Sequence, residues 1–221
     1  MMTCETSLRM IERSGVIAVL RGKFPPAVAL EVARVLINAG FDVFEFTMNS
    51  EQPLEAMRAV KREYGDAACV GMGTVLNREM AQQALDAGAD LIVAPSFDPA
   101  VVELAQRADV LAVPGVMTPT EIVNAWESGA RLVKLFPIGA LGTDYLKAVL
   151  GPLNHVSFIC NGGIDDQNIA AFLKAGAKAC GMGGWLTGDG SMPLEQINQR
   201  AHLLRSIVDA ARTGQPSPRM A

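Results

Sequence analysis

The chain has 221 residues, half of them hydrophobic and 19% charged, with a net charge of −4 at pH 7. This supplies the core of one domain, which we expect to cover residues 1–221, with flexible ends at 1–5 and 213–221. The acidic balance argues against nucleic-acid binding, which needs a basic face. Because we find no signal peptide, no apolar run of roughly 20 residues and no paired cysteine spacing, we expect a cytoplasmic protein with reduced thiols and no membrane partner.

Four similar phrases recur along the chain, about every 40 to 50 residues: Ala39-Gly40-Phe41-Asp42, Ala87-Gly88-Ala89-Asp90, Ser128-Gly129-Ala130-Arg131 and Ala175-Gly176-Ala177-Lys178. Each follows a helical pattern and precedes an apolar, β-like run. This is the pattern of a helix that ends with glycine at its C′ position and turns into a strand. Repeated βα units predict a parallel sheet.

The predicted elements alternate from one end of the chain to the other. A helix at 5–13 precedes the first strand, and the strands are expected at 16–20, 43–47, 68–72, 91–94, 110–113, 132–135, 156–160 and 179–182. The helices that follow them are expected at 27–38, 52–63, 77–86, 99–107, 119–127, 143–150, 166–174 and 194–212. This α/β order predicts a (β/α)8 TIM barrel with an extra N-terminal helix. A doubly wound open sheet is the alternative, although no G-x-G-x-x-G follows the first strand.

Unusual residues gather where these strands end, which in a barrel is where the active site lies. Lys134 interrupts an apolar strand, and burial there would favour the neutral amine, a nucleophile suited to a Schiff base with a carbonyl substrate. A lysine in a strand can also extend outward to water. The other candidates are Arg21, Glu45, Asn49, Thr74, Pro95, Phe136, Asn161, Gly162, Gly163, Gly183 and Gly184.

Each candidate has a plainer interpretation as well. Glu45 is a possible ion-pair partner, Arg21 a possible strand cap, and the glycine pairs are common in tight turns. The glycine pairs are also suited to anion binding, because loops after barrel strands 7 and 8 often hold phosphate. Together the candidates fit carbon–carbon bond cleavage beside a 2-keto acid, in which Lys134 forms the imine and Glu45 moves protons. Arg21 with Thr74 would hold the keto-acid carboxylate.

These residues resemble the 2-keto-3-deoxy-6-phosphogluconate/4-hydroxy-2-oxoglutarate aldolase family over about residues 8–210. The resemblance lies in Ile17-Ala18-Val19-Leu20-Arg21, Glu45-Phe46-Thr47, Gly71-Met72-Gly73-Thr74-Val75-Leu76, Pro114-Gly115-Val116-Met117-Thr118-Pro119-Thr120-Glu121 and Lys134-Leu135-Phe136-Pro137. It implies a class I lyase on a (β/α)8 barrel, without metal or cofactor and usually a homotrimer. It also implies Lys134 as the Schiff-base lysine, Glu45 as the acid/base, and Arg21, Thr74, Pro95 and Phe136 around the pyruvate end.

The expected reaction is reversible cleavage of a 2-keto-3-deoxy sugar acid to pyruvate and an aldehyde such as glyceraldehyde 3-phosphate. Three departures from the family pattern bear on the substrate. Asn49 stands where many members have arginine, which is closer to the 6-phosphogalactonate branch and leaves the carboxylate to Arg21. Asn161 replaces the threonine of a Pro-Thr-Gly-Gly loop, and Gly184 replaces a serine. The last two changes leave phosphate, another anion or a neutral polyol open as the distal group.

Four alternatives remain at this stage. The substrate could be an unphosphorylated 2-keto acid such as 4-hydroxy-2-oxoglutarate. The chain could instead be a barrel isomerase or synthase that binds a sugar phosphate, or a barrel that binds without catalysis. A metal-dependent pyruvate aldolase would need converging ligands, but His155 and His202 do not fall at the predicted active face.

Overall fold

The computed structural model describes residues 2–214, and its centre is a parallel sheet curved into a barrel. The strands, in the spatial order β5-β4-β3-β2-β1-β9-β8-β7-β6, pair only in parallel. Their bounds are β1 Val16–Leu20, β2 Val43–Thr47, β3 Cys69–Gly73, β4 Leu91–Val93, β5 Leu111–Val113, β6 Gly115–Val116, β7 Val133–Leu135, β8 Phe158–Asn161 and β9 Ala179–Met182. The predicted (β/α)8 barrel is confirmed.

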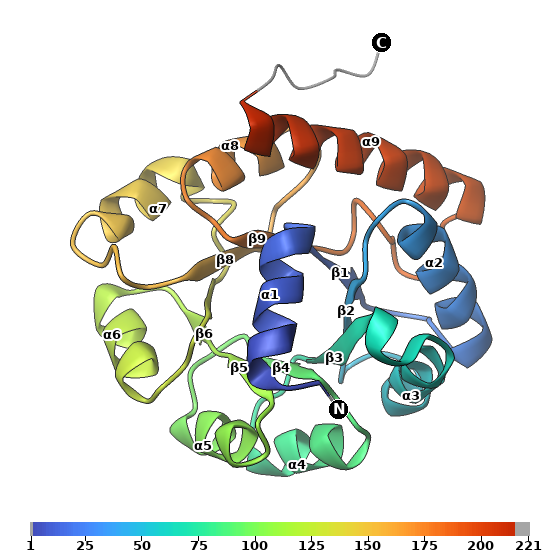
Figure 1. The fold of residues 1–221 in the computed structure, drawn as a ribbon, viewed down its shortest axis with the longest axis horizontal. Coiled ribbons are helices and arrows are strands. Elements are labelled where there is room, and N and C mark those ends of the chain that lie inside the picture. The colour runs from blue at the N-terminus through green and yellow to red at the C-terminus, as the bar shows by residue number, and fades with distance from the viewer. Residues whose placement is uncertain (1, 215–221) are drawn as a thin grey trace.

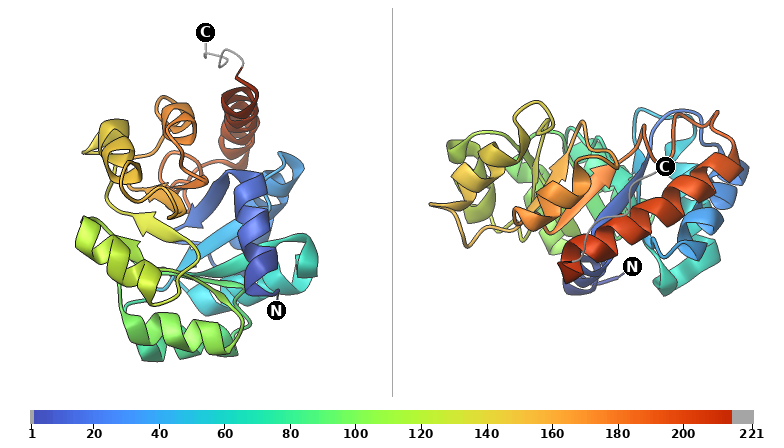
Figure 2. Two further views of the ribbon diagram at one scale, coloured as in Figure 1. Left: turned by 60° about the vertical axis from the view of Figure 1, so that its left-hand side comes forward. Right: turned by 90° about the horizontal axis from the view of Figure 1, so that it is seen from above.

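Helices surround this sheet, and one crosses its open end (Figure 1). They are α1 Cys4–Ser14, α2 Pro26–Asn38, α3 Pro53–Tyr64, α4 Arg78–Asp86, α5 Pro99–Arg107, α6 Pro119–Glu127, α7 Gly142–Leu150, α8 Ile169–Lys174 and α9 Leu194–Thr213, with a short 3₁₀ turn at Gly65–Ala67. Seen from the side, α9 runs along the outside of the barrel near α2 and α8 (Figure 2), the two helices with which it makes most of its helix contacts.

The fifth strand was predicted to end at residue 113, and in the structure a further short strand, β6, follows it directly after Pro114. Proline has no N–H to give to a strand ladder. β5 therefore pairs with β4, and β6 pairs with β7. β5 and β6 stand at the two ends of the strand order, and only Pro114 separates them along the chain. The carbonyl of Pro114 also accepts a 2.8 Å hydrogen bond from the amide of Lys134 in β7. The barrel is therefore closed at this point by the continuous chain.

The recurring glycine phrases end helices, as their pattern predicts. Gly40, Gly88, Gly129 and Gly176 all have positive φ, between 87° and 115°. This left-handed conformation is strained for residues with a Cβ, so glycine permits the sharp turn into the next strand.

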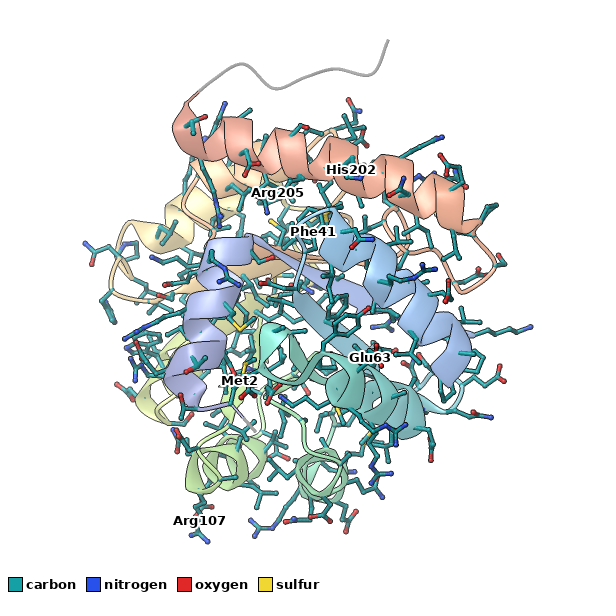
Figure 3. All side chains as sticks on the ribbon, turned by 45° about the vertical axis from the view of Figure 1, so that its right-hand side comes forward. Met2, Phe41, Glu63, Arg107, His202 and Arg205 are labelled. Atoms are coloured by element: carbon teal, nitrogen blue, oxygen red, sulfur yellow. The ribbon has the colours of Figure 1, made fainter. Side chains whose placement is uncertain are left out.

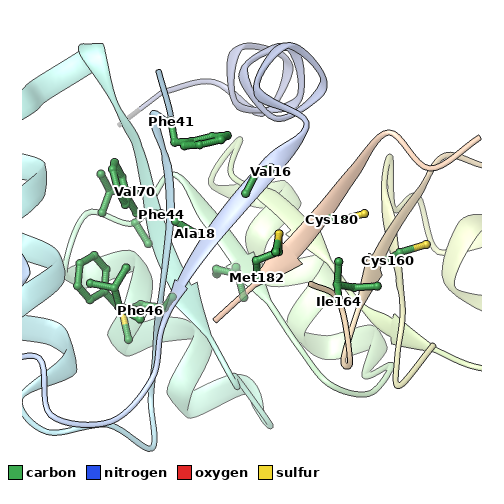
Figure 4. Close-up of a cluster of buried hydrophobic side chains, with 14 of the residues drawn as sticks. Val16, Ala18, Phe41, Phe44, Phe46, Val70, Cys160, Ile164, Cys180 and Met182 are labelled. Atoms are coloured by element: carbon green, nitrogen blue, oxygen red, sulfur yellow. The ribbon is translucent and has the colours of Figure 1, made fainter. Parts of the chain in front are cut away.

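Two apolar clusters hold the barrel together. The larger one lies between the strands and the outer helices and includes Phe44, Phe46 and Val70 (Figure 4). The smaller one fills the barrel interior at the N-terminal ends of the strands, where Met10 and Ile11 of α1 cover it. Because α1 closes this end, the opposite end is the one that can admit a substrate.

Residues 2–5, at the end that we expected to be flexible, make specific contacts with the rest of the chain. Met2 is buried, and its amide nitrogen donates a 2.7 Å hydrogen bond to the buried carboxylate of Asp90. Helix α1 starts at Cys4, and Thr3 is its N-cap. Residues 2–5 are therefore held by specific contacts, and the position of Met2 can be seen in Figure 3. Of the expected C-terminal end, Thr213 is the last residue of α9, and residues 215–221 lie outside the described part.

All four cysteines are free thiols. Burial raises the pKa of Cys69 and of Cys160 to about 12, which keeps both thiols protonated and unreactive. Within residues 2–214, no helix has the length and hydrophobicity that crossing a membrane requires.

Candidate active site

A pocket of about 620 Å³ opens at the C-terminal ends of the strands, opposite α1. Nine of the twelve residues predicted from the sequence line it: Arg21, Glu45, Lys134, Phe136, Asn161, Gly162, Gly163, Gly183 and Gly184. They come from β1, β2, β7, β8 and β9 or from the loops that follow these strands. The barrel therefore brings together residues that are up to 163 positions apart in the sequence.

Lys134 lies inside the barrel rather than at its surface. Its side chain is 4% exposed, and its Nζ lies 4.9 Å from the ring centroid of Phe136. No carboxylate of the described residues lies within 4.0 Å of this nitrogen. A buried amine without a neutralising partner is costly for folding and useful as a nucleophile.

Glu45 is completely buried, and neither carboxylate oxygen has a hydrogen-bond partner among the described residues. Glu45 pairs with Gly71 in the register of β2 and β3, yet its side chain leans toward the strand ends and covers Gly73. A Cβ at residue 73 would lie 1.8 Å from Oε1, so only glycine leaves room for this carboxylate. The ion-pair interpretation of Glu45 has no support in this arrangement, which leaves both carboxylate oxygens without a partner among the described residues.

Arg21 and Thr74 meet at the rim of the pocket. Arg21 is exposed, and its Nη2 donates a 3.3 Å hydrogen bond to Oγ1 of Thr74. Thr74 has a φ of 57°, which is strained for a β-branched residue and turns the chain at the end of β3. The remaining guanidinium N–H groups can bind a carboxylate in the forked geometry that arginine favours.

The glycine loops present unused backbone donors. Gly162 and Gly163 have φ values of 86° and 77°. The amides of Gly163, Ile164 and Gly184 donate to no acceptor in the described part of the chain. Such exposed amides suit an anion or the hydroxyl groups of a sugar chain. A Cβ at Gly184 would meet nothing within 4 Å, so a side chain there is sterically possible.

Asn161 adds a polar group to the pocket wall. It is 4% exposed, and its Oδ1 is buried without a partner among the described residues. Gly181 of the neighbouring strand makes room for it, since a Cβ at residue 181 would lie 1.8 Å from Nδ2. Gly73 and Gly181 thus serve the same purpose for two different polar side chains.

Three predicted residues lie outside the pocket lining. Asn49 is exposed in the loop after β2, Thr74 contacts Arg21 as described above, and Pro95 packs its backbone against Gly115. The sequence reasoning missed five lining residues: Val19, Ile164, Gly181, Gly188 and Asp189. Val19 lies two residues before Arg21, and Gly181 lies two residues after Ala179. Because residues two apart in a strand face the same side, both could have been predicted to face the barrel interior. No sequence pattern near Asp189 predicts that it lines the pocket.

No three His, Cys, Asp or Glu side chains within residues 2–214 are grouped to hold a metal ion. His155 packs edge-on against Trp126, with ring centroids 6.0 Å apart. His202 lies on the outer face of α9 (Figure 3). Neither histidine lines the pocket, so the arrangement gives no support to a metal-dependent aldolase.

A (β/α)8 barrel whose mouth holds a buried lysine and a buried carboxylate, neither with a charged partner within residues 2–214, has the parts of a lysine-dependent lyase. The family model "KDPG and KHG aldolase" matches residues 8–200, and the chain belongs to this family. It is therefore an aldolase, a carbon–carbon lyase.

Relatives in this family match most of the chain. The 2-dehydro-3-deoxy-6-phosphogalactonate aldolase of Escherichia coli K12 is 34% identical over 195 residues, covering 88% of this chain and 95% of its own. The 2-dehydro-3-deoxy-phosphogluconate aldolase of Treponema pallidum is 39% identical over 160 residues, covering 72% and 75%. A native KDPGal structure superposes with a TM-score of 0.86 at 33% identity, covering 90% of this chain and 96% of its own.

A 3-hexulose-6-phosphate synthase also superposes, with a TM-score of 0.68, 22% identity and coverage of 86% and 98%. At this identity the likeness concerns the fold alone. The isomerase or synthase alternative therefore gains nothing from it.

Proposed function

We propose that this protein is a class I pyruvate aldolase that reversibly cleaves a 2-keto-3-deoxy-6-phospho sugar acid, of the gluconate or galactonate type. The products are pyruvate and an aldehyde such as glyceraldehyde 3-phosphate, and residues 1–221 act as one aldolase domain. The observation that carries the proposal is the pair of Lys134 and Glu45, both buried. Among the described residues, Lys134 has no carboxylate within 4.0 Å, and the Glu45 carboxylate has no hydrogen-bond partner. A 2-keto acid supplies the carbonyl that such a lysine can attack.

Lys134 begins the reaction by attacking the C2 carbonyl of the substrate, and loss of water from the carbinolamine leaves a protonated imine. Glu45, acting through water, removes the proton of the C4 hydroxyl. The C3–C4 bond then breaks, the aldehyde leaves, and the electron pair moves into the imine to give an enamine. Glu45 returns the proton to C3, and hydrolysis frees pyruvate and Lys134.

The keto-acid carboxylate is assigned to Arg21, with Thr74 holding the guanidinium in place. Phe136 shapes the pyruvate end, and Pro95 and Asn49, although they lie outside the pocket lining, are proposed to contribute to the same end. Asn161 and the glycine loops at 162–163 and 183–184 receive the sugar chain and its distal group. A KDPG aldolase from Legionella pneumophila, 26% identical with a TM-score of 0.78, was solved with pyruvate as a covalent carbinolamine, which supports the lysine mechanism proposed here.

Borohydride trapping with pyruvate tests this proposal. We expect wild-type protein to gain one pyruvyl-derived mass at Lys134, and Lys134→Ala to gain none while keeping its fold. Lys147→Ala, which alters an exposed lysine of α7, is the matched control and should label like the wild type. A label on any other lysine would overturn the assignment of Lys134.

One observation favours a second substrate class, the unphosphorylated 2-keto acids such as 4-hydroxy-2-oxoglutarate. Gly184 provides no hydroxyl at the position where family members often have serine, although space for one exists. Pyruvate release from a panel of phosphorylated and unphosphorylated 2-keto acids separates the two classes. The order of kcat/KM across the panel assigns the substrate.

The assembly that we propose is a homotrimer in the cytoplasm. A chain of a designed protein cage built by fusing symmetric oligomeric domains is 33% identical with a TM-score of 0.86, covering 90% of this chain and 74% of its own, which supports a symmetric assembly. The four free thiols support a reducing compartment. Sedimentation at micromolar concentration should give a trimer, and a monomer would contradict the proposal.

A further inference from the structure

Asp189 brings a carboxylate to the distal end of the pocket. It lines the pocket beside Gly183, Gly184 and Gly188, in the loop that follows β9. This is the end assigned above to the distal group of the substrate. A carboxylate repels a phosphate dianion, but it accepts hydrogen bonds from hydroxyl groups.

The carboxylate of Asp189 is held in place by its own loop. Its Oδ1 accepts hydrogen bonds from the hydroxyl of Ser191 at 2.7 Å and from the amide of Ser191 at 3.1 Å. The side-chain hydrogen bond from Ser191, followed by the one from its amide, holds the pKa of Asp189 below its ordinary value. The group is therefore ionised at neutral pH, while Oδ2 accepts no hydrogen bond from the described residues.

The backbone at Asp189 is fixed as well, by the loop that carries Arg21. The carbonyl of Asp189 accepts a 2.7 Å hydrogen bond from the amide of Lys23. Gly22 and Gly190 allow this close approach: a Cβ at residue 22 would lie 2.4 Å from the Asp189 carbonyl, and one at residue 190 would lie 2.0 Å from the Lys23 carbonyl. The two loops are joined by backbone contacts, so Asp189 has a defined place at the pocket.

The charges around the distal end leave Asp189 without a close counter-ion. No basic side chain of the described residues lies within 4.0 Å of its carboxylate. The charge of Lys23 lowers the pKa of Asp189, but this is the smallest of the contributions to its shift. The neighbouring glycines offer only backbone amides, so a phosphate bound there would meet neutral donors and the Asp189 carboxylate, with the charge of Lys23 more than 4.0 Å from that carboxylate.

We infer that Asp189 is a specificity-determining residue that acts on the distal group of the substrate and weakens the preference for phosphate over hydroxyl. The inference rests on the proposed aldolase function. It assigns to this site a substrate class in which a hydroxyl-terminated 2-keto-3-deoxy acid competes well with its phosphorylated form.

The test compares kcat/KM for 2-keto-3-deoxy-6-phosphogluconate with that for 2-keto-3-deoxygluconate. Asp189→Asn removes the charge but keeps an oxygen for Ser191, and Asp189→Ala removes both. Asp189 is exposed, so its charge acts largely through water. We therefore expect each variant to raise the ratio of phosphorylated to unphosphorylated kcat/KM by roughly two- to fivefold, the size typical of exposed charge pairs. Asp144→Asn, which removes an equally negative and 96% exposed carboxylate from α7, should leave the ratio unchanged.

Salt separates a charge effect from a change of shape. At about 1 M ionic strength, where the Debye length is about 3 Å, the difference between wild type and Asp189→Asn should largely disappear. An unchanged or lowered ratio in Asp189→Asn, or a shift seen only in Asp189→Ala, would overturn the inference. Failure of the aldolase proposal would look different, because wild-type protein would then release no pyruvate from either compound and trap none with borohydride.

Discussion

Gly73→Ala should disable Glu45 without altering any charged group. The new Cβ would lie 1.8 Å from Oε1, 2.4 Å from Cδ and 2.5 Å from Cγ of Glu45, so the carboxylate has to move. Overpacking of this kind costs about 1–3 kcal/mol of stability, which a folded barrel can tolerate. Since displacing a catalytic group by about 1 Å can cost about 100-fold, we expect kcat/KM for aldol cleavage to fall by about that factor.

The assay for this variant follows the exchange of the C3 protons of pyruvate by NMR. The melting temperature of each variant is measured as well, to separate lost activity from lost stability. Gly151→Ala is the matched control, because its Cβ would have no neighbour closer than 3.5 Å and its φ of −52° suits alanine. The double variant Gly73→Ala/Glu45→Gln should exchange about as slowly as Glu45→Gln alone, since both changes act on one group. Exchange at the wild-type rate in Gly73→Ala, or fully additive losses in the double variant, would refute the reasoning.

Four further changes test other parts of the molecule. Glu45→Gln should still bind pyruvate but slow C3-proton exchange by about 10²–10⁴-fold, and exchange at the wild-type rate would remove Glu45 from the mechanism. Arg21→Lys should raise KM for pyruvate, because an ammonium does not reproduce the forked contact; wild-type kinetics would place the carboxylate elsewhere. Gly184→Ser, which has open space, should raise the preference for phosphorylated substrate by roughly tenfold if a hydrogen bond to a charged group forms, and an unchanged kcat/KM ratio would show that residue 184 does not reach the distal group. Asp90→Ala should lower the free energy of unfolding by about 3 kcal/mol, because it removes the buried carboxylate that forms a 2.5 Å ion pair with Lys61. Urea titration measures this change, and a loss below about 1 kcal/mol would contradict the prediction.

Much of the fold could be predicted from the sequence, because its signals are local. A helix ended by glycine and followed by an apolar run is a pattern of adjacent residues, and its recurrence predicts parallel strands. Once the strands are parallel in a barrel, their C-terminal ends must meet, which is why Lys134, Glu45 and Arg21 could be grouped in advance. The further short strand after Pro114 and the anchoring of Met2 by Asp90 were not foreseen, since both depend on which distant backbone group each residue meets.

The sequence by itself therefore determined the barrel, its active end and the residue types that gather there. Only the tertiary structure decided how those residues are arranged. Glu45 could have been an ion-pair partner, but in the structure its side chain lies over Gly73, and no cation of the described residues is within 4.0 Å of its carboxylate. Asp189 reaches the pocket because two loops 168 residues apart, at Arg21 and Asp189, meet through glycine contacts. Strand register and loop packing are set by contacts between residues far apart in the chain, and no local pattern encodes them.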